Sequence, residues 1–292
     1  WLCLETDTGT LRSLFRQEKR KKYSALADGL HVTPSTLEFE SISRLSQRGV
    51  FSNKTVIVNG LSGDFLFGGH VPAELLDQPF RAVAVDKIID KHCSHTRSRW
   101  LDQYTQVLKK KLLLDLDYWA IEDGDVDRLC AFYEHWDWKE RQAKAVMVHQ
   151  RLYEAFDLSW ELPLWDRRLV EVASRVPLIG RFQQRTHQKY LEQSRHRELF
   201  LIPRVKTRLW QGAWKIVPYL GKLVGVLLGP KAKSFVYRRL FFFGYFRHQL
   251  GLFGIREFWR VSKLARPPYV IAVATVSRLR ELGIDFWEQI EP

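Results

Sequence analysis

The stretch that decides the fold runs from Thr55 to His70 and reads Thr-Val-Ile-Val-Asn-Gly-Leu-Ser-Gly-Asp-Phe-Leu-Phe-Gly-Gly-His. It opens with an apolar, β-branched run, Val56 to Val58, which predicts a short buried strand. The strand ends at Asn59 and leads into a glycine-rich loop. Open α/β sheets bind their ligands beyond the carboxyl ends of the strands, so we expect a ligand site in this loop.

The loop contains several glycines and a single acidic residue, Asp64. Glycine permits positive φ and close backbone approach, so main-chain amides in such a loop can face an anion. A lone carboxylate beside phosphates favours Mg²⁺, a hard cation that prefers oxygen ligands. The alternative is an ordinary strand-to-helix turn in which Asp64 caps the helix.

Two ordered blocks of the sequence resemble the asparagine synthetase family. Gly60 to His70 resembles the family loop G-x-G-x-D-E-L-F-G-G-Y, and a downstream block resembles E-x-R-x-P-F-L-D followed by L-V, I-P and K-x-x-L-R. The downstream residues are Tyr153-Glu154-Ala155-Phe156, Pro163-Leu164-Trp165-Asp166, Leu169-Val170, Val176-Pro177 and Lys189-Tyr190-Leu191. The Pro-Leu-Trp-Asp spelling is closest to asparagine-synthetase-like amidotransferases of bacterial surface-sugar clusters. The resemblance covers roughly residues 25–195.

The resemblance implies an α/β fold: a partial parallel-sheet ATP-pyrophosphatase domain over residues 1–198, followed by a mostly helical part. It also implies a ligase that adenylates a carboxylate with ATP and captures it with ammonia or an amine. The acceptor would be aspartate or the carboxylate of a sugar. A glutaminase domain or a separate protein would donate the ammonia.

The same resemblance assigns the site residues. Mg²⁺ would bind Asp64, and Lys189 would neutralise charge on the phosphates as the adenylate forms, a task that suits a compact point charge. An ordinary solvated lysine is the alternative reading of Lys189. The residues expected to contact the nucleotide are Gly60, Ser62, Gly63, Asp64, Gly68 and Gly69.

Three features depart from the family pattern. Leu61 stands where the synthetases carry an acid–base side chain, and leucine neither donates nor accepts a proton. Ser159 takes the place of a family glutamate, and Glu161 takes that of the family arginine. The family ATP loop Ser-Gly-Gly-x-Asp-Ser is absent and the chain opens at Trp1, so we expect an upstream segment to complete the pyrophosphate site. A catalytically silent relative is therefore a rival hypothesis.

Charge is distributed unevenly along the chain. The net charge is +13, and residues 181–292 hold 21 Lys and Arg against 7 Asp and Glu. We expect residues 199–292 to form a basic, aromatic-rich helical appendage with a solvated basic face. Weak contact with an anionic membrane surface is an alternative, and nucleic-acid binding is a rival that we do not favour. Three scattered cysteines and no apolar run of about 18 residues favour a cytoplasmic protein, peripheral at most to the inner membrane face.

The remaining patterns predict structural roles. We expect a helix from residue 34 to Gly49, an amphipathic helix over residues 139–156, and a helix capped by Asp166. The acidic cluster at residues 122–127 lacks the spacing of a calcium loop and is expected at a helix N-terminus. For His92-Cys93-Ser94-His95 we expect a structural or surface role, and a metal cluster is the alternative. No partner in sequence is evident for His31, His70 or His149, so no triad is predicted.

Overall fold

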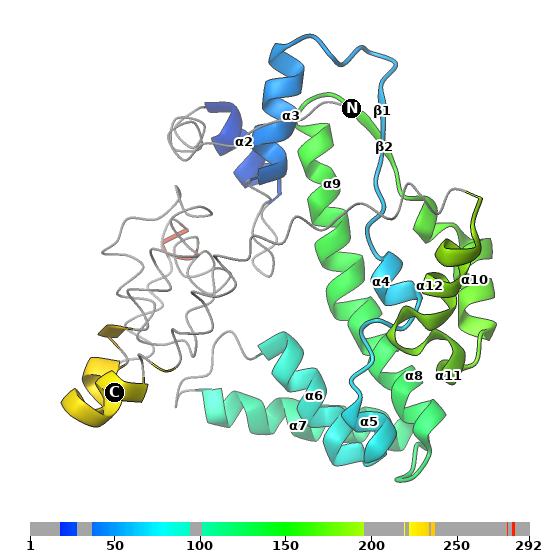
Figure 1. Cartoon of the computed structure of the whole chain (residues 1–292), viewed down its shortest axis with the longest axis vertical. Coiled ribbons are helices and arrows are strands. Elements are labelled where there is room, and N and C mark those ends of the chain that lie inside the picture. Colours follow the sequence, from blue (N-terminus) through cyan, green and yellow to red (C-terminus); the bar gives the residue numbers. More distant parts are fainter. Residues whose placement is uncertain are drawn as a thin grey trace.

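A computed structural model describes residues 18–27, 37–93 and 101–195, and a few positions near the C-terminus: 219, 222–233, 235–236, 279 and 282–283. The described part is mostly helical and contains one small parallel sheet, consistent with a partial α/β fold (Figure 1). The boundary expected near residue 198, and most of the appendage expected beyond it, lie outside the described residues.

The elements follow in chain order. The α-helices are α2 Glu18–Leu26, α3 Leu37–Gln47, α4 Gly63–Leu66, α5 Glu74–Asp77, α6 Arg81–Cys93, α7 Leu101–Tyr118, α8 Val126–Asp137, α9 Met147–Glu154, α10 Arg167–Arg175, α11 Leu178–Arg181 and α12 Arg185–Gln193. The strands are β1 Val56–Val58 and β2 Ser159–Glu161. A π-helix, η2 Trp138–Val146, and two 3₁₀ turns, η3 Pro163–Trp165 and η4 Phe182–Gln184, complete the set.

One long helix organises the described part. Helices α8, η2 and α9 follow each other without a break, and Figure 1 shows them as a single rod with other elements on its flanks. The Asp125 side chain starts the rod by accepting a hydrogen bond from the Arg128 backbone amide. This confirms the helix N-terminus predicted for the acidic cluster. A helix was also expected over residues 139–156, but its first half is π-helical.

The π-helical segment has a consequence for the side chains that it presents. In an α-helix of 3.6 residues per turn, residues five apart point about 140° away from each other. In a π-helix the i→i+5 hydrogen-bonding pattern places them on nearly the same face. Asp137 and Gln142 are five residues apart, and both contact the loop after β1. The periodicity of apolar residues does not report this change of helix type.

The long helix carries a hydrophobic core at each end. The first core joins α5, α6 and α7 to α8, and its fully buried side chains include Leu75, Ile88, Leu116 and Leu129. The second core packs α2 and α3 against α9 around Tyr23, Phe39 and Leu152. The π-helical middle of the long helix therefore lies between two packed ends. The polar contacts described below involve this middle segment.

The sheet has two parallel strands. Register pairs Val56 with Ser159, Ile57 with Trp160 and Val58 with Glu161. The strand expected at residues 56–58 is confirmed, whereas β2 was not anticipated because Ser-Trp-Glu has no strand-like apolar pattern. The expectation that β1 is buried is wrong, since Val56 is 46 % and Val58 66 % exposed. Only one face of the described sheet, through Ile57 and Trp160, packs against the second core.

The glycines after β1 permit close packing against distant segments. A Cβ at Gly63 would lie 2.9 Å from Leu164 Cδ1, and one at Gly69 would lie 2.9 Å from Gln184 Nε2. Gly68 has a φ of +72°, and a Cβ there would lie 2.9 Å from the Arg181 carbonyl oxygen. Gly60 differs, because its Cβ would meet nothing within 4 Å. The requirement for glycine is strongest at Gly68, where the φ is positive and the close atoms belong to the Arg181 backbone, and weakest at Gly60.

We predict that Gly68→Ala lowers the free energy of unfolding by about 1–3 kcal/mol, because it adds both a positive-φ penalty and a backbone clash. Gly60→Ala is the matched control and should change it by less than about 0.5 kcal/mol. Urea denaturation of both variants measures the difference. Equal stability of the two variants would contradict the packing role of Gly68.

Candidate functional site

Asp64 lies in the first turn of α4, directly after the β1 loop. Its Oδ1 accepts a hydrogen bond from the Phe65 amide at 2.9 Å, and its Oδ2 lies 2.9 Å from His70 Nε2. The side chain remains 58 % exposed. Burial raises the pKa of Asp64, but the hydrogen bond and charge of His70 outweigh it, so the pKa lies below its usual value. Asp64 is therefore an exposed, ionised carboxylate held by an internal partner.

His70 links Asp64 to the long helix. Its Nδ1 lies 2.6 Å from Oδ2 of Asp137, whose side chain is fully buried, while Nε2 faces Asp64. A ring nitrogen bonds to a carboxylate through an N–H group that it donates, and here each of the two carboxylates faces its own ring nitrogen. The ring edge also packs against Phe65, with centroids 5.7 Å apart. No partner for His70 is evident in the sequence, and the structure supplies two, Asp137 and Asp64.

Asp137 is surrounded by basic side chains from α6. Lys91 Nζ lies 3.2 Å from Oδ2, and His92 Nε2 lies 3.4 Å from Oδ1. Burial raises the pKa of Asp137, but the hydrogen bond from His70 and the charge of Lys91 outweigh it and lower the pKa to about 2. Burial also lowers the pKa of Lys91, which Asp137 partly restores. The buried carboxylate is thus ionised and held by His70 and Lys91, whereas its Oδ1 lies beside His92 without a hydrogen bond.

The π-helical segment adds a polar network beside His70. Gln142 is buried, its Oε1 accepts a hydrogen bond from Ser62 Oγ at 2.9 Å, and its Nε2 lies 3.4 Å from His70 Nδ1. Trp165 Nε1 donates to the same Ser62 oxygen at 3.1 Å. Ser62 has a φ of +73°, a strained value for a serine. The exposed Arg141 places NH1 3.4 Å from the His70 ring.

The two blocks that carry the family resemblance meet in this region. Ser62 and Gly63 contact Trp165 and Leu164 of η3. Farther along the loop, the Phe67 ring stacks on His187 of α12, with centroids 4.7 Å apart. Lys189 is exposed on α12, two residues beyond His187. The structure therefore brings the segments of Asp64 and Lys189 together through Phe67 and His187.

The structure also places Asp166 and His92, two further positions for which the sequence predicts a role. Asp166 caps α10 by accepting a hydrogen bond from the Arg168 amide, as expected. His92 is buried against Asp137, which agrees with a structural role, whereas Ser94 and His95 lie outside the described residues. Among the residues that the structure describes, no three His, Cys, Asp or Glu side chains are grouped so as to hold a metal ion.

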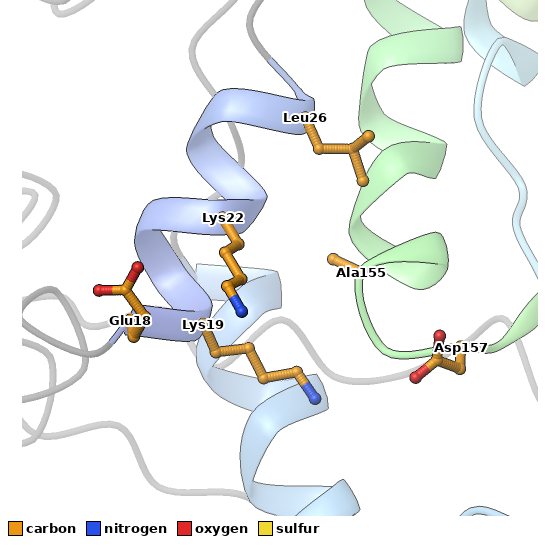
Figure 2. A pocket seen from close by; sticks show the side chains of 6 residues that line it. All are labelled: Glu18, Lys19, Lys22, Leu26, Ala155 and Asp157. Atoms are coloured by element: carbon orange, nitrogen blue, oxygen red, sulfur yellow. The ribbon is translucent and has the colours of Figure 1, made fainter.

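A separate pocket of about 410 Å³ lies at the far end of the long helix, between α2 and the turn after α9. Figure 2 shows Lys19 and Lys22 extending from α2 on one side, with Ala155 and Asp157 on the other. Lys19 also lies over the Phe156 ring, 4.0 Å from its centroid. None of the site residues predicted from the sequence lines this pocket, although Ala155 belongs to the downstream block of the resemblance.

Comparison of the chain with protein-family models, curated proteins and solved structures gave no match.

The stability of the fold should depend on the pH through His92. Burial lowers the pKa of His92 to about 4 from 6.5, despite the opposing charge of Asp137; Lys91 and Arg141 lower it further. Between these values the unfolded chain binds the proton and the folded chain does not, so acidification favours unfolding. We predict that protonation of His92 lowers the free energy of unfolding by on the order of 2 kcal/mol as the pH falls from 6.5 to 4.

Urea unfolding at several pH values measures the effect. His92→Gln should flatten the loss of stability over this interval, whereas His135→Gln, at an exposed position on α8, should leave the slope as in the wild type. An unchanged slope in His92→Gln would show that the buried imidazole is not the group responsible.

Proposed function

We propose that the chain is the pyrophosphate-handling part of an ATP-dependent, amide-forming enzyme of the asparagine-synthetase type. The observation that carries this proposal is the packing of the β1 loop against residues 163–165 and 181–187. Residues 163–165 belong to the downstream block that resembles the family, and residues 181–187 lie within the span of that block, between Val176-Pro177 and Lys189-Tyr190-Leu191. Ser62 and Trp165 are 103 residues apart in the sequence. The parallel pairing of β1 with β2, which precede the two segments, supports an ATP-pyrophosphatase-like sheet.

In this proposal Asp64 holds Mg²⁺ together with phosphate oxygens of the nucleotide. The residue fits that task, because its carboxylate is ionised, more than half exposed, and uses only one internal hydrogen bond per oxygen. A carboxylate oxygen has two lone pairs, so acceptor capacity remains. Mg²⁺ commonly binds through one or two carboxylates plus substrate phosphates. When bound, the ion neutralises charge on the pyrophosphate leaving group.

The other residues have supporting roles. Lys189 would place a mobile positive charge beside the phosphates, from a helix that is fixed to the loop by the Phe67–His187 stack. Exposed Arg141 adds a second positive group near Asp64. The substrate is a small carboxylate, of aspartate or a sugar, and the nitrogen comes from ammonia supplied elsewhere. Gly60 offers the most open backbone for contact with the nucleotide.

The rival hypothesis of a silent relative rests on Leu61 and Ser159. Leu61 precedes the strained Ser62, and Ser159 is an exposed residue of β2 opposite Val56. Neither position is filled by an acid–base side chain. Binding of the leaving group, measured directly, tests the phosphate site without requiring turnover.

We predict that the 292-residue chain binds Mn²⁺ with pyrophosphate through Asp64 and Lys189, even though its sequence lacks the family ATP loop, which would add further phosphate contacts. Electron paramagnetic resonance of the ion monitors the binding. Asp64→Asn should weaken binding about tenfold or more, because it removes a charged oxygen ligand. Lys189→Gln should weaken it about fivefold through loss of one charge contact of about 1 kcal/mol. Asp86→Asn and Lys54→Gln, on α6 and before β1, are the matched controls and should bind as the wild type does. Equal binding by all five proteins would exclude this phosphate site.

A second proposal concerns residues 222–233, which are helical. Three consecutive apolar side chains are strongly exposed there, Val226 at 83 %, Leu227 at 70 % and Leu228 at 71 %. Lysines 222, 231 and 233 flank them. An apolar surface bordered by lysines suits the interface of an anionic membrane. In the described residues, no helix combines the length and the apolar character needed to cross a membrane. From the exposed apolar run and its flanking lysines we propose weak peripheral contact with an anionic membrane.

Sedimentation with phosphatidylglycerol-containing vesicles tests this contact. We predict weak binding that falls steeply as NaCl is raised from 0.1 to about 0.5 M, because the Debye length shortens. The double variant Val226→Asp, Leu227→Asp should bind at least about fivefold less. Val172→Asp, at an exposed position of α10, is the control. Salt-independent binding, or binding unaffected by the double variant, would refute the proposal.

A further inference from the structure

Three side chains form a line from the surface to the interior beside the proposed phosphate site. Asp64 is 58 % exposed, His70 is 11 % exposed, and Asp137 is fully buried. They come from α4, from the turn after it, and from the end of α8. Because each contacts the next, the orientation of the exposed carboxylate is tied to the core of the protein.

The inner end of this line cannot readily move. Asp137 Oδ2 is 2.6 Å from His70 Nδ1 and 3.2 Å from Lys91 Nζ. Asp137 is also the residue that immediately precedes the π-helical segment. The imidazole is held on the other side by Phe65 and faces Gln142. Its Nε2 is thereby aimed at Asp64 Oδ2, 2.9 Å away.

Two costly backbone features support this arrangement. The π-helix is a rare conformation that is frequently found at functional sites, and here it begins immediately after Asp137. Ser62 adopts a left-handed conformation and is bonded to Gln142 of the π-helix. Both features hold the loop of Asp64 against the segment that carries Asp137.

We propose that His70 is a positioning residue for Asp64. Anchored by the buried Asp137, it fixes one oxygen of Asp64 and leaves the remaining acceptor capacity of that carboxylate for the cation–pyrophosphate ligand. This inference rests on the proposed function. In this inference His70 orients Asp64 at the phosphate site in addition to packing, and Asp137 acts indirectly by holding His70.

Two substitutions separate the two contacts of the ring. Asparagine places its amide nitrogen near the position of Nδ1, so His70→Asn retains a donor for Asp137 and loses the contact with Asp64. Glutamine places its amide nitrogen near the position of Nε2, so His70→Gln retains a donor for Asp64 and loses the contact with Asp137. The two variants have the same change in charge and are matched controls for each other.

The experiment measures two quantities for the full chain: the affinity for Mn²⁺ with pyrophosphate, and the urea midpoint of unfolding. We expect His70→Asn to bind at least about fivefold more weakly, with its midpoint within about 0.3 M of the wild type. We expect His70→Gln to bind within about twofold of the wild type, with its midpoint lowered by about 1 M or more. This crossed pattern is one that a purely structural histidine would not give.

Three other outcomes would count against the positioning role of His70. Wild-type affinity in His70→Asn, or parallel loss of affinity and stability in both variants, overturns the positioning role while leaving the phosphate site intact. If the wild type itself binds no Mn²⁺ with pyrophosphate, the proposed function fails and this inference fails with it.

Discussion

The buried Asp137 carboxylate is the constraint on which the rest of the structure depends. Removing an ionised carboxylate from water costs several kcal/mol unless charged partners compensate it. Here the compensation comes from two separate parts of the chain: the hydrogen bond with His70, from the segment after α4, and the charge of Lys91, from α6. Satisfying this one group therefore fixes the β1 loop, α6 and the long helix against each other, and the low pKa of Asp137 follows from the same contacts.

The π-helical turn and the loop glycines both allow the β1 loop to pack closely against distant segments of the chain. The wider turn lets Asp137 and Gln142 face the loop together, so one reaches His70 and the other reaches Ser62. The glycines let the loop approach Leu164 on one side and Arg181 on the other. Arg181 is itself held by Glu134 of α8, with NH2 2.5 Å from Oε2. The loop is thus clamped between the long helix and α10–α12, with Asp64 at its exposed edge.

Sequence reasoning succeeded where the signal was local. The strand Val56–Val58, the helix start at the acidic cluster of residues 122–127 and the cap by Asp166 are confirmed, because β-branched runs and capping carboxylates act within a few residues. It failed where the signal was long-range. Nothing near His70 indicates that Asp137 is its partner, since 67 residues separate them. The strand β2 is specified by its pairing with β1, and the π-helix by contacts with the loop.

The same distinction applies to the candidate site. The loop of Asp64 could be found from its glycine spacing, and Lys189 only from a resemblance, whereas Arg141, Gln142 and Lys91 carried no pattern that marked them. The sequence places His92 in a His-Cys cluster, but in the structure its neighbour is the Asp137 carboxylate. Among the described residues it is not part of a group that could hold a metal ion. Polar residues that converge from distant elements are visible only once the core is assembled.

A double-mutant cycle between His70 and Asp137 tests the central claim most directly. Unfolding free energies of the wild type, His70→Ala, Asp137→Ala and the double variant give the coupling between the two side chains. Because the contact is short, buried and charge-assisted, we predict a coupling of about 1.5–3 kcal/mol. Additive effects, with a coupling below about 0.5 kcal/mol, would show that the long helix and the loop of Asp64 are not held together by this interaction.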